Sequence, residues 1–505
     1  QQKISQLKLF GRFSSAYINI MLLKNNFLLG LLLCIKISSS TVVVRKKASL
    51  SKNTATLTRS GGFSFPSFRK QQVTPTKEED VSVSNYWYAV LHNWLYFLSL
   101  GLCIPTLPRV IASVVNEDGS TQVSARSSRI GGDVEGVDKL LTFLGVGALG
   151  ALSDVVGRKI MIAIGALGYA MTIALQLSAR RNNIKLLFIA DVVDGATSCM
   201  NAVSSAYVVD SVQDPEKRAI AVGIFQGLSV GGAFIVGFPL AGILSNKNLA
   251  PRRPMMLACV LQIFNALLAL LWTPESLSQK NRRPLASMLS FIRTDGNPVA
   301  ALKRLFGKNA DIILRAAAQA YTFAWFANLA LNTVFVNYVN VVFGWGPQQS
   351  GPLLVVVGLM LAVVPRFAVS RFGLELSIQL GALIFALGYA SIGIFARTNS
   401  TYFFFSIMIC GLGAIVVPAL TALVATRASD TERGAVLGAL QTLQELCGAF
   451  AYPIYGRVLA AALQESSKVP TAAPFYLASA CLLITLALAK LKHLGQDETK
   501  QKSSF

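Results

Sequence analysis

Three acidic side chains of this 505-residue chain stand inside long apolar stretches, where a charge is costly and is therefore a candidate for function. Asp191 and Asp194 are three positions apart, so a helix would place them on one face. Two carboxylates that close in a low-dielectric site could share and carry a proton. The alternative is that each is a structural partner for a Lys or Arg at a helix end. Glu445 is the third acid and completes the candidate proton-coupling set.

Amide and aromatic side chains in other stretches have the chemistry to bind an organic solute. Glu445 shares a helical face with Gln441, and Gln226 is related to Gln441 by an internal repeat described below. We predict that these amides line a polar cavity, although polar groups also join membrane helices by hydrogen bonds. A second polar face, in the stretch 312–342, would stack on a solute or would be ordinary packing with an interfacial aromatic. The candidate cavity residues are Gln226, Tyr321, Trp325, Asn328, Asn332, Gln441 and Gln444.

The composition indicates that membrane-spanning helices hold these side chains. The chain is 53% hydrophobic and 14% charged, whereas soluble proteins carry about 25% charged residues. The seven cysteines lie in apolar runs without a CxxC pair, so we predict buried hydrophobic residues rather than disulfides or metal ligands. With two histidines and no HExxH or GxSxG sequence, we expect neither an enzyme nor a metal or other cofactor.

Apolar stretches predict an all-α membrane protein with twelve transmembrane helices in two sets of six. The first set is predicted at 86–114, 134–153, 159–178, 186–209, 219–244 and 254–273, and the second at 312–342, 350–369, 376–396, 402–424, 434–460 and 474–492. Between them, we predict a basic connector with an amphipathic helix on the membrane surface. Basic residues in the loops after spans two, four, eight and ten predict that these loops and both termini face the cytosol or its organellar equivalent.

A self-comparison supports two related halves. Arg218-Ala-Ile-Ala-Val-Gly-Ile-Phe-Gln226 recurs as Arg433-Gly-Ala-Val-Leu-Gly-Ala-Leu-Gln441, displaced by 215 positions. Repeated halves are how many transporters build a central site that can open to either side. The predicted organisation is an N-terminal extension (1–80), a first bundle (81–273), a linker (274–310), a second bundle (311–492) and a C-terminal tail (493–505).

The N-terminal extension is strongly basic. The net charge of the chain is +22, and residues 1–77 hold 13 Lys or Arg and no acid. An apolar run after Lys24, followed by a Ser-, Thr- and Lys-rich stretch, resembles a signal followed by a transit peptide, as in bipartite plastid presequences. The alternative is a basic tail held near anionic lipid. The predicted location is therefore an organellar (plastid) membrane, or otherwise the plasma membrane or an endomembrane. Because no folded basic module surrounds these charges, we expect no nucleic-acid partner.

The loop between the second and third predicted spans, Gly150-Ala-Leu-Ser-Asp-Val-Val-Gly-Arg-Lys159, closely resembles the signature loop of the major facilitator superfamily. The resemblance covers about residues 86–492 and implies the major facilitator fold, with two pseudo-symmetric six-helix bundles. It also implies that Asp154 and Arg158 belong to a charge cluster that holds the inner face closed. The candidate signature-loop and gating residues are Gly150, Asp154, Gly157, Arg158, Lys159, Asp210, Arg218 and Arg433.

Within that family, the chain resembles the tetracycline-efflux and hippocampus-abundant-transcript group. The resemblance rests on Gly101-Leu-Cys-Ile-Pro-Thr-Leu-Pro108 in the first span and on Val417-Pro-Ala-Leu420 in the tenth. The chain departs from the drug-antiporter pattern at Asp191, where relatives carry an Arg associated with proton coupling. The alternative is a different branch of the family with the same loop.

These observations predict a secondary active transporter that moves a small organic solute by alternating access, with efflux slightly favoured and proton coupling left open. The alternative is a non-transporting relative that acts as a sensor or as a membrane assembly partner. The expected partners are the solute, protons where transport is coupled to them, and the lipid bilayer. We expect the chain to act as a monomer.

Overall fold

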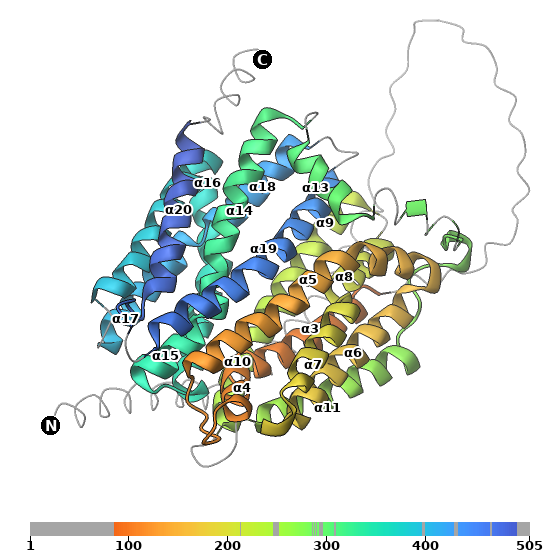
Figure 1. Cartoon of the computed structure of the whole chain (residues 1–505). Coiled ribbons are helices and arrows are strands. Elements are labelled where there is room, and N and C mark those ends of the chain that lie inside the picture. The colour runs from red at the N-terminus through yellow and green to blue at the C-terminus, as the bar shows by residue number, and fades with distance from the viewer. Residues whose placement is uncertain are drawn as a thin grey trace, which may run out of the picture. The chain divides into compact units, whose positions relative to one another are not determined.

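The computed structural model describes residues 85–491, except 213, 246–251, 285, 287, 289, 292–295, 308–309, 396–398, 429–432 and 465–466. The described residues form helices and their connecting loops (Figure 1). The predicted targeting segment and the C-terminal tail lie outside the described residues.

The first six predicted spans are present as helices. Span one is a bent pair, α3 (Trp87–Cys103) and α4 (Leu107–Val115), with 46° between the two parts. Pro105 lies in the break and Pro108 in the first turn of α4, and proline cannot donate a backbone hydrogen bond, which accounts for the bend. The other spans are α5 (Ala125–Val156), α6 (Arg158–Ser178), α7 with α8 (Lys185–Thr197 and Met200–Ser211), α9 with η2 and α10 (Pro215–Ile224, Phe225–Gly232 and Ala233–Leu244), and α11 (Arg252–Leu271).

Helix α5 begins earlier than predicted, at Ala125 instead of residue 134. A capping box starts it, because the Ser124 hydroxyl accepts from the Ser127 backbone at 3.2 Å and the Ser127 hydroxyl accepts from the Ser124 backbone at 2.8 Å. Charges interrupt the apolar pattern in this first part of the helix, which is why the prediction began later. These charges are Arg126, Arg129 and Asp133.

The second set of predicted spans is also helical. It consists of α14 with α15 (Ile312–Thr333 and Phe335–Phe343, bent by 43°), α16 (Pro347–Phe395), α17 with α18 (Ser400–Gly413 and Val416–Arg427), α19 (Arg433–Ala462) and α20 (Ala473–Leu491). Helix α16 holds spans eight and nine around a break at Gly373, where φ is +74°. Counting each bent pair once, ten of the described segments are long and apolar enough to cross a membrane. The first part of α16 and helix α19 are the other two predicted spans.

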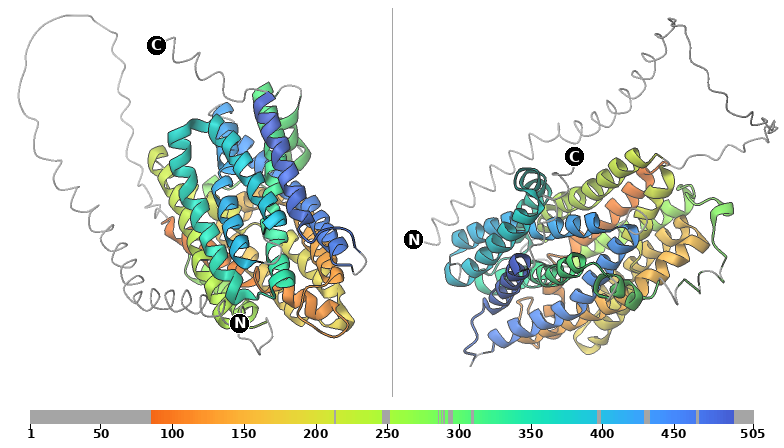
Figure 2. Two further views of the ribbon diagram at one scale, coloured as in Figure 1. Left: turned by 90° about the vertical axis from the view of Figure 1, so that its left-hand side faces the viewer. Right: turned by 90° about the horizontal axis from the view of Figure 1, so that it is seen from above.

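The helices gather in two bundles, α3–α11 and α14–α20 (Figure 1, Figure 2). In the first bundle, α3 packs on α10 and α11, and α6 packs on α7 and α11. In the second bundle, α16 packs on α17 and α20, and α14 packs on α18 and α20. The bundles meet at two crossings, α5 with α19 and α10 with α16. This arrangement confirms the predicted fold class.

The linker contains a short 3₁₀ turn, η3 (Gln279–Asn281), and the helix α13 (Pro298–Phe306). The Asn297 side chain caps α13 by accepting from the Val299 backbone at 2.8 Å. Leu305 of α13 is fully buried in the core of the second bundle, where the helix packs against α19. The apolar face of α13 therefore lies on protein, whereas the sequence predicted a helix on the membrane surface.

Candidate functional site

The two bundles approach most closely where α5 crosses α19. Gly132 and Gly136 of α5 face Tyr452, Pro453 and Gly456 of α19. A Cβ at Gly132 would lie 2.5 Å from the carbonyl oxygen of Tyr452, and a Cβ at Gly136 would lie 2.5 Å from Pro453 Cγ. The two helices can therefore meet at this distance only because both α5 positions are glycine.

The second crossing closes the same end of the interface. A Cβ at Gly242 of α10 would lie 3.0 Å from the carbonyl oxygen of Pro347, at the start of α16. Nearby, the Val123 backbone before α5 donates to Asn340 Oδ1 of α15 at 2.9 Å. We call the interface of α5 and α10 with α16 and α19 the seam, and this end of it the closed end.

The glycine contacts differ at the other end, where the signature loop lies. Helices α5 and α19 run antiparallel, so the last part of α5 lies at the same end as the first part of α19. Several glycines of α5, α9, η2 and α19 have no heavy atom within 4 Å of the place where a Cβ would lie. They are Gly150, Gly223, Gly227, Gly231, Gly434 and Gly438. The seam is therefore closed at one end and open at the signature-loop end.

A lysine joins the bundles inside the seam. Lys139 Nζ of α5 lies 2.7 Å from Asp138 Oδ2 and 3.8 Å from Glu445 Oε2 of α19. Its side chain is 27% exposed, and that of Asp138 is 6% exposed. Asp194 interacts electrostatically with all three groups. Glu135 of α5 belongs to the same group of charges. One ammonium group among four carboxylates, in a partly buried site, is an arrangement that can take up and release a proton.

The three predicted proton-coupling acids lie in different surroundings. Glu445 lies in the seam, and its Oε2 has no hydrogen-bond partner among the described residues. Asp194 belongs to the cluster around Lys139. Asp191 is 3% exposed and accepts a hydrogen bond from Gln176 Nε2 at 3.2 Å inside the first bundle. The sequence prediction overlooked Lys139, although a charge in an otherwise apolar helix was the signal that could have found it.

The predicted cavity residues divide into exposed and buried groups. Gln226, Asn332 and Gln441 are exposed, and Asn328 is half-buried. An amide is poorly suited to contact lipid, so the seam is the favourable surrounding for Gln226 and Gln441. Both stand beside the open glycines of their helices, Gly227 and Gly438.

Tyr321 is fully buried inside the second bundle. Its ring stacks on Trp325 with 6.0 Å between centroids and 6° between planes. Its hydroxyl accepts a hydrogen bond from Gln444 Nε2. In this conformation, Tyr321 therefore positions Gln444 and does not itself reach the seam surface.

The signature loop folds into an ion-pair cluster. Arg158 Nη1 lies 2.7 Å from Asp154 Oδ1, and Arg158 Nε lies 3.0 Å from Asp210 Oδ2. Gly157 makes the turn between α5 and α6 with φ at +111°, a backbone conformation that favours glycine. Glu275, at the start of the linker, accepts from the Arg158 backbone at 2.8 Å and so caps α6 with a negative charge.

Two linker arginines complete this cluster. The Arg283 backbone donates to the Asp154 carbonyl oxygen at 3.0 Å, and Arg283 Nε lies 3.7 Å from Asp154 Oδ2. Arg282 Nη2 lies 3.7 Å from Glu275 Oε2. Within the part of the chain that the structure describes, the ion pairs of Asp154 and Arg158 join the first bundle and the linker. None of them reaches the second bundle, as expected while this end of the seam is open.

The other candidate signature and gating residues lie around this end. The Lys159 backbone donates to Glu275 Oε2 at 3.3 Å, and Arg218 Nε donates to the Val212 carbonyl oxygen at 2.9 Å. Gly150 faces open space on α5. Arg433 is the first residue of α19, across the seam.

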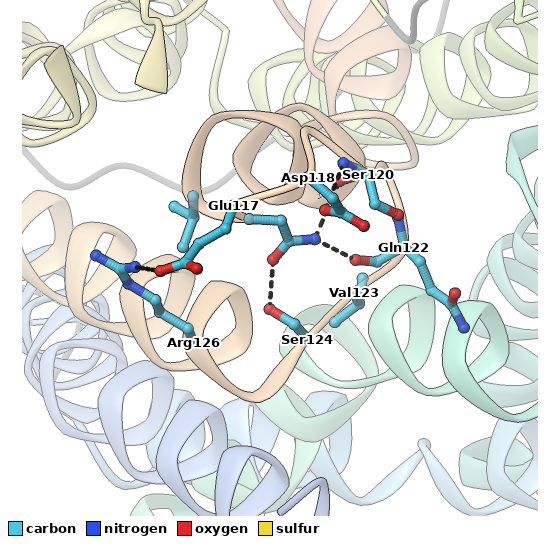
Figure 3. Close-up of a pocket in the computed structure, with 9 residues that line it drawn as sticks. Glu117, Asp118, Ser120, Gln122, Val123, Ser124 and Arg126 are labelled. Carbon is cyan, nitrogen blue, oxygen red and sulfur yellow. Dashed lines mark hydrogen bonds and ion pairs between the residues drawn. The ribbon is translucent and has the colours of Figure 1, made fainter. Parts of the chain in front are cut away.

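A pocket lies at the closed end, in the loop between α4 and α5 (Figure 3). Asn116 organises this loop, because its Nδ2 donates to the Ser120 carbonyl oxygen at 3.0 Å and its Oδ1 accepts from the Ser124 hydroxyl at 2.6 Å. These bonds hold the loop in the shape that lets Val123 reach the second bundle. The pocket is lined by residues within 115–126, and the predicted cavity residues are not among them.

Known proteins are similar to this chain in sequence and in fold. The family model described as Major Facilitator Superfamily matches residues 139–452. Tetracycline resistance protein, class C, of Escherichia coli is 28% identical over 354 residues, which are 69% of this chain and 83% of the relative. Hippocampus abundant transcript-like protein 1 of Bos taurus is 25% identical over 331 residues, 64% of this chain and 63% of the relative.

Two solved structures have the same fold. The human organic anion transporter MFSD10 (TETRAN) superposes with a TM-score of 0.57 at 20% identity, over 80% of this chain and 98% of that one. A D-xylose-proton symporter superposes with a TM-score of 0.63 at 15% identity, over 80% of this chain and 97% of that one. The similarities confirm the resemblance carried by the signature loop and by the first and tenth spans.

Proposed function

We propose that the chain, which belongs to the major facilitator superfamily, moves a small organic solute across a membrane by alternating access. The observation that carries this proposal is the seam, which the same helices close at one end and leave open at the signature-loop end. Its closing contacts are glycine crossings and a few polar bonds, rather than one continuous apolar core. Such contacts can separate and form again at modest cost, as rocking of two bundles requires.

We further propose that the cluster around Lys139 couples this movement to protons. Lys139 is attracted to Glu445 across the seam and to Asp138, Glu135 and Asp194 within the first bundle. A proton on Glu445 would remove the attraction across the seam and leave Lys139 to the first-bundle carboxylates. Protonation would thus loosen α5 from α19, and deprotonation would restore the contact.

The solute and the direction of transport are proposed in broad terms. The names of the relatives indicate solutes as different as tetracycline and xylose. The exposed amides Gln226 and Gln441 suit the hydrogen-bonding groups of many such molecules. Efflux is favoured because the tetracycline resistance protein has the higher identity of the two sequence relatives described above.

Uptake into sealed liposomes that hold the full-length chain tests the proposal. We expect saturable transport of at least one of tetracycline and xylose, accelerated by a pH gradient. The matched inactive control is Gly132→Trp, in which an indole replaces the hydrogen that faces Tyr452 O, so that the closed end cannot form. If the unaltered chain transports none of the solutes faster than Gly132→Trp does, the proposal fails for these solute classes, and the sensor or assembly role gains support.

A further inference from the structure

Span five contains a wide helical turn, η2, between two α-helical parts. In this π-helical segment, Phe225–Gly232, each backbone N–H reaches a carbonyl one residue further back than in an α-helix. Each residue of an α-helix turns the chain by about 100° around the helix axis. One additional residue in a turn therefore rotates the part of the helix before it by about that angle relative to the part after it. Such turns are uncommon, often lie at functional sites and need contacts that hold them.

Two buried side chains hold this turn. The Ser229 hydroxyl donates to the Phe225 carbonyl oxygen at 2.5 Å, one turn back along the same segment. Asn93 Nδ2 of α3 donates to the Ser229 oxygen at 2.8 Å and to Asn201 Oδ1 of α8 at 3.2 Å. Because the single hydroxyl hydrogen of Ser229 is used on Phe225, Ser229 must accept from Asn93, which fixes the orientation of the amide.

This arrangement leaves a polar atom without a partner. Asn93 is fully buried, and its Oδ1 has no hydrogen-bond donor among the described residues. A buried amide oxygen without a donor is unfavourable, so packing alone does not explain why an asparagine occupies this position. The amide nitrogen of Asn93, in contrast, is used in the hydrogen bond to Ser229.

The wide turn determines which side chain of span five faces the seam. Gln226 lies in the turn and is exposed, and its neighbours Gly227 and Gly231 face open space. Further along the span, Gly242 is three helical turns beyond Gly231 and touches Pro347 of the second bundle. The face with Gly227 and Gly231 is therefore the face that looks toward the second bundle.

We propose that Asn93 and Ser229 are positioning residues that hold the wide turn so that Gln226 faces the seam, where it hydrogen-bonds the solute. Without their bonds, the segment would return to an α-helical register and turn Gln226 away from the seam. The part of this inference that concerns the solute rests on the proposed transport function. The part that concerns the orientation of Gln226 does not.

Thiol labelling tests the orientation without any solute. The full-length Gln226→Cys variant in sealed vesicles is treated with a membrane-impermeant methanethiosulfonate. Labelling of the native cysteines is measured in the chain without this substitution and is subtracted. We expect labelling in the otherwise unaltered chain and with Ser229→Thr, which keeps a hydroxyl. We expect the labelling to be lost with Ser229→Ala and with Asn93→Leu.

A second reporter separates a local rotation from a general change. Gly438→Cys, on the open part of α19, should stay labelled in every background. The inference is overturned if Gln226→Cys is still labelled when Ser229→Ala or Asn93→Leu is present. It is also overturned if these changes reduce the labelling of Gln226→Cys and of Gly438→Cys to the same extent. If the labelling behaves as expected but no solute is transported, the positioning role stands and the transport function fails. If a solute is transported, Ser229→Ala should raise its KM and Ser229→Thr should restore it.

Discussion

Asp133 and Arg457 lie on different bundles and form an ion pair at the closed end of the seam, with 2.7 Å between Asp133 Oδ1 and Arg457 Nη1. Their side chains are 26% and 51% exposed, so the pair is screened by water. A pair of this kind contributes about 0.5 kcal/mol. This is too little to lock the seam, but it is enough to bias the equilibrium between its closed and open forms.

Reversing one charge of this pair should open the closed end more often. With Arg457→Glu, the two facing carboxylates repel each other, and labelling of Ser128→Cys beside the crossing should rise about two- to fivefold, as expected for about 0.5–1 kcal/mol. The double change Asp133→Arg with Arg457→Glu should return labelling toward the original rate. Equal labelling in the single and double variants would show that the pair does not influence the seam.

A methyl group at Gly132 should destabilise the closed end. Its Cβ would lie 2.5 Å from the Tyr452 carbonyl oxygen, whereas a Cβ at the neighbouring Gly131 would meet only Ile111 at 3.5 Å. Overpacking of this kind costs about 1–3 kcal/mol. We expect Gly132→Ala to reduce transport about tenfold or more, since 1.4 kcal/mol is a factor of ten, and Gly131→Ala to leave it near the original rate. Similar rates for both variants would contradict the assigned crossing.

Replacing Glu445 by Gln should slow uptake and flatten its dependence on pH. The amide keeps the size of the side chain but can neither attract Lys139 as an anion nor take up a proton. The matched control is Glu117→Gln in the loop at the closed end, where the side chain is 82% exposed. Initial uptake rates from pH 5 to 8 are the measurement. A Glu445→Gln profile that follows that of the unaltered chain would remove Glu445 from the mechanism.

The turn at Gly157 should be intolerant of a side chain. With φ at +111° and ψ at 154°, Gly157→Ala strains the backbone by about 1–3 kcal/mol. The new Cβ would also lie 2.4 Å from Glu275 Oε2. We expect a lower melting temperature for the purified protein in detergent. Gly150→Ala, seven positions earlier in helical backbone with open space around it, should be neutral or slightly stabilising. A lower melting temperature for Gly150→Ala alone would contradict this reading of the loop.

Helix positions were predictable because each span is a continuous, mainly apolar stretch of roughly 20 residues, which can be recognised without knowing how the span packs on its neighbours. The predicted third span, 159–178, differs by one residue from α6. The charges inside a span were harder to interpret, because hydropathy does not show whether Asp138 and Lys139 of the second predicted span are paired. In the structure they form an ion pair, which lowers the cost of burial.

Tertiary contacts could not be predicted from local pattern. Nothing in the sequence around Glu275 shows that its carboxylate caps a helix more than 100 positions earlier. The buried position of Tyr321 and the open end of the seam likewise depend on how whole helices pack. The signature loop was predictable because its turn, its glycine and its charges lie within ten consecutive residues.

The bond from Glu275 to the first turn of α6 has a consequence for biogenesis. Glu275 follows the sixth span. A ribosome must therefore translate past α11, the last helix of the first bundle, before the first turn of the third span, α6, can receive its cap. A nascent chain halted at the end of α11 would hold six inserted segments with the amide groups of Arg158 and Lys159 still lacking their acceptor. The first bundle is thus completed by residues of the linker, which follow its last span.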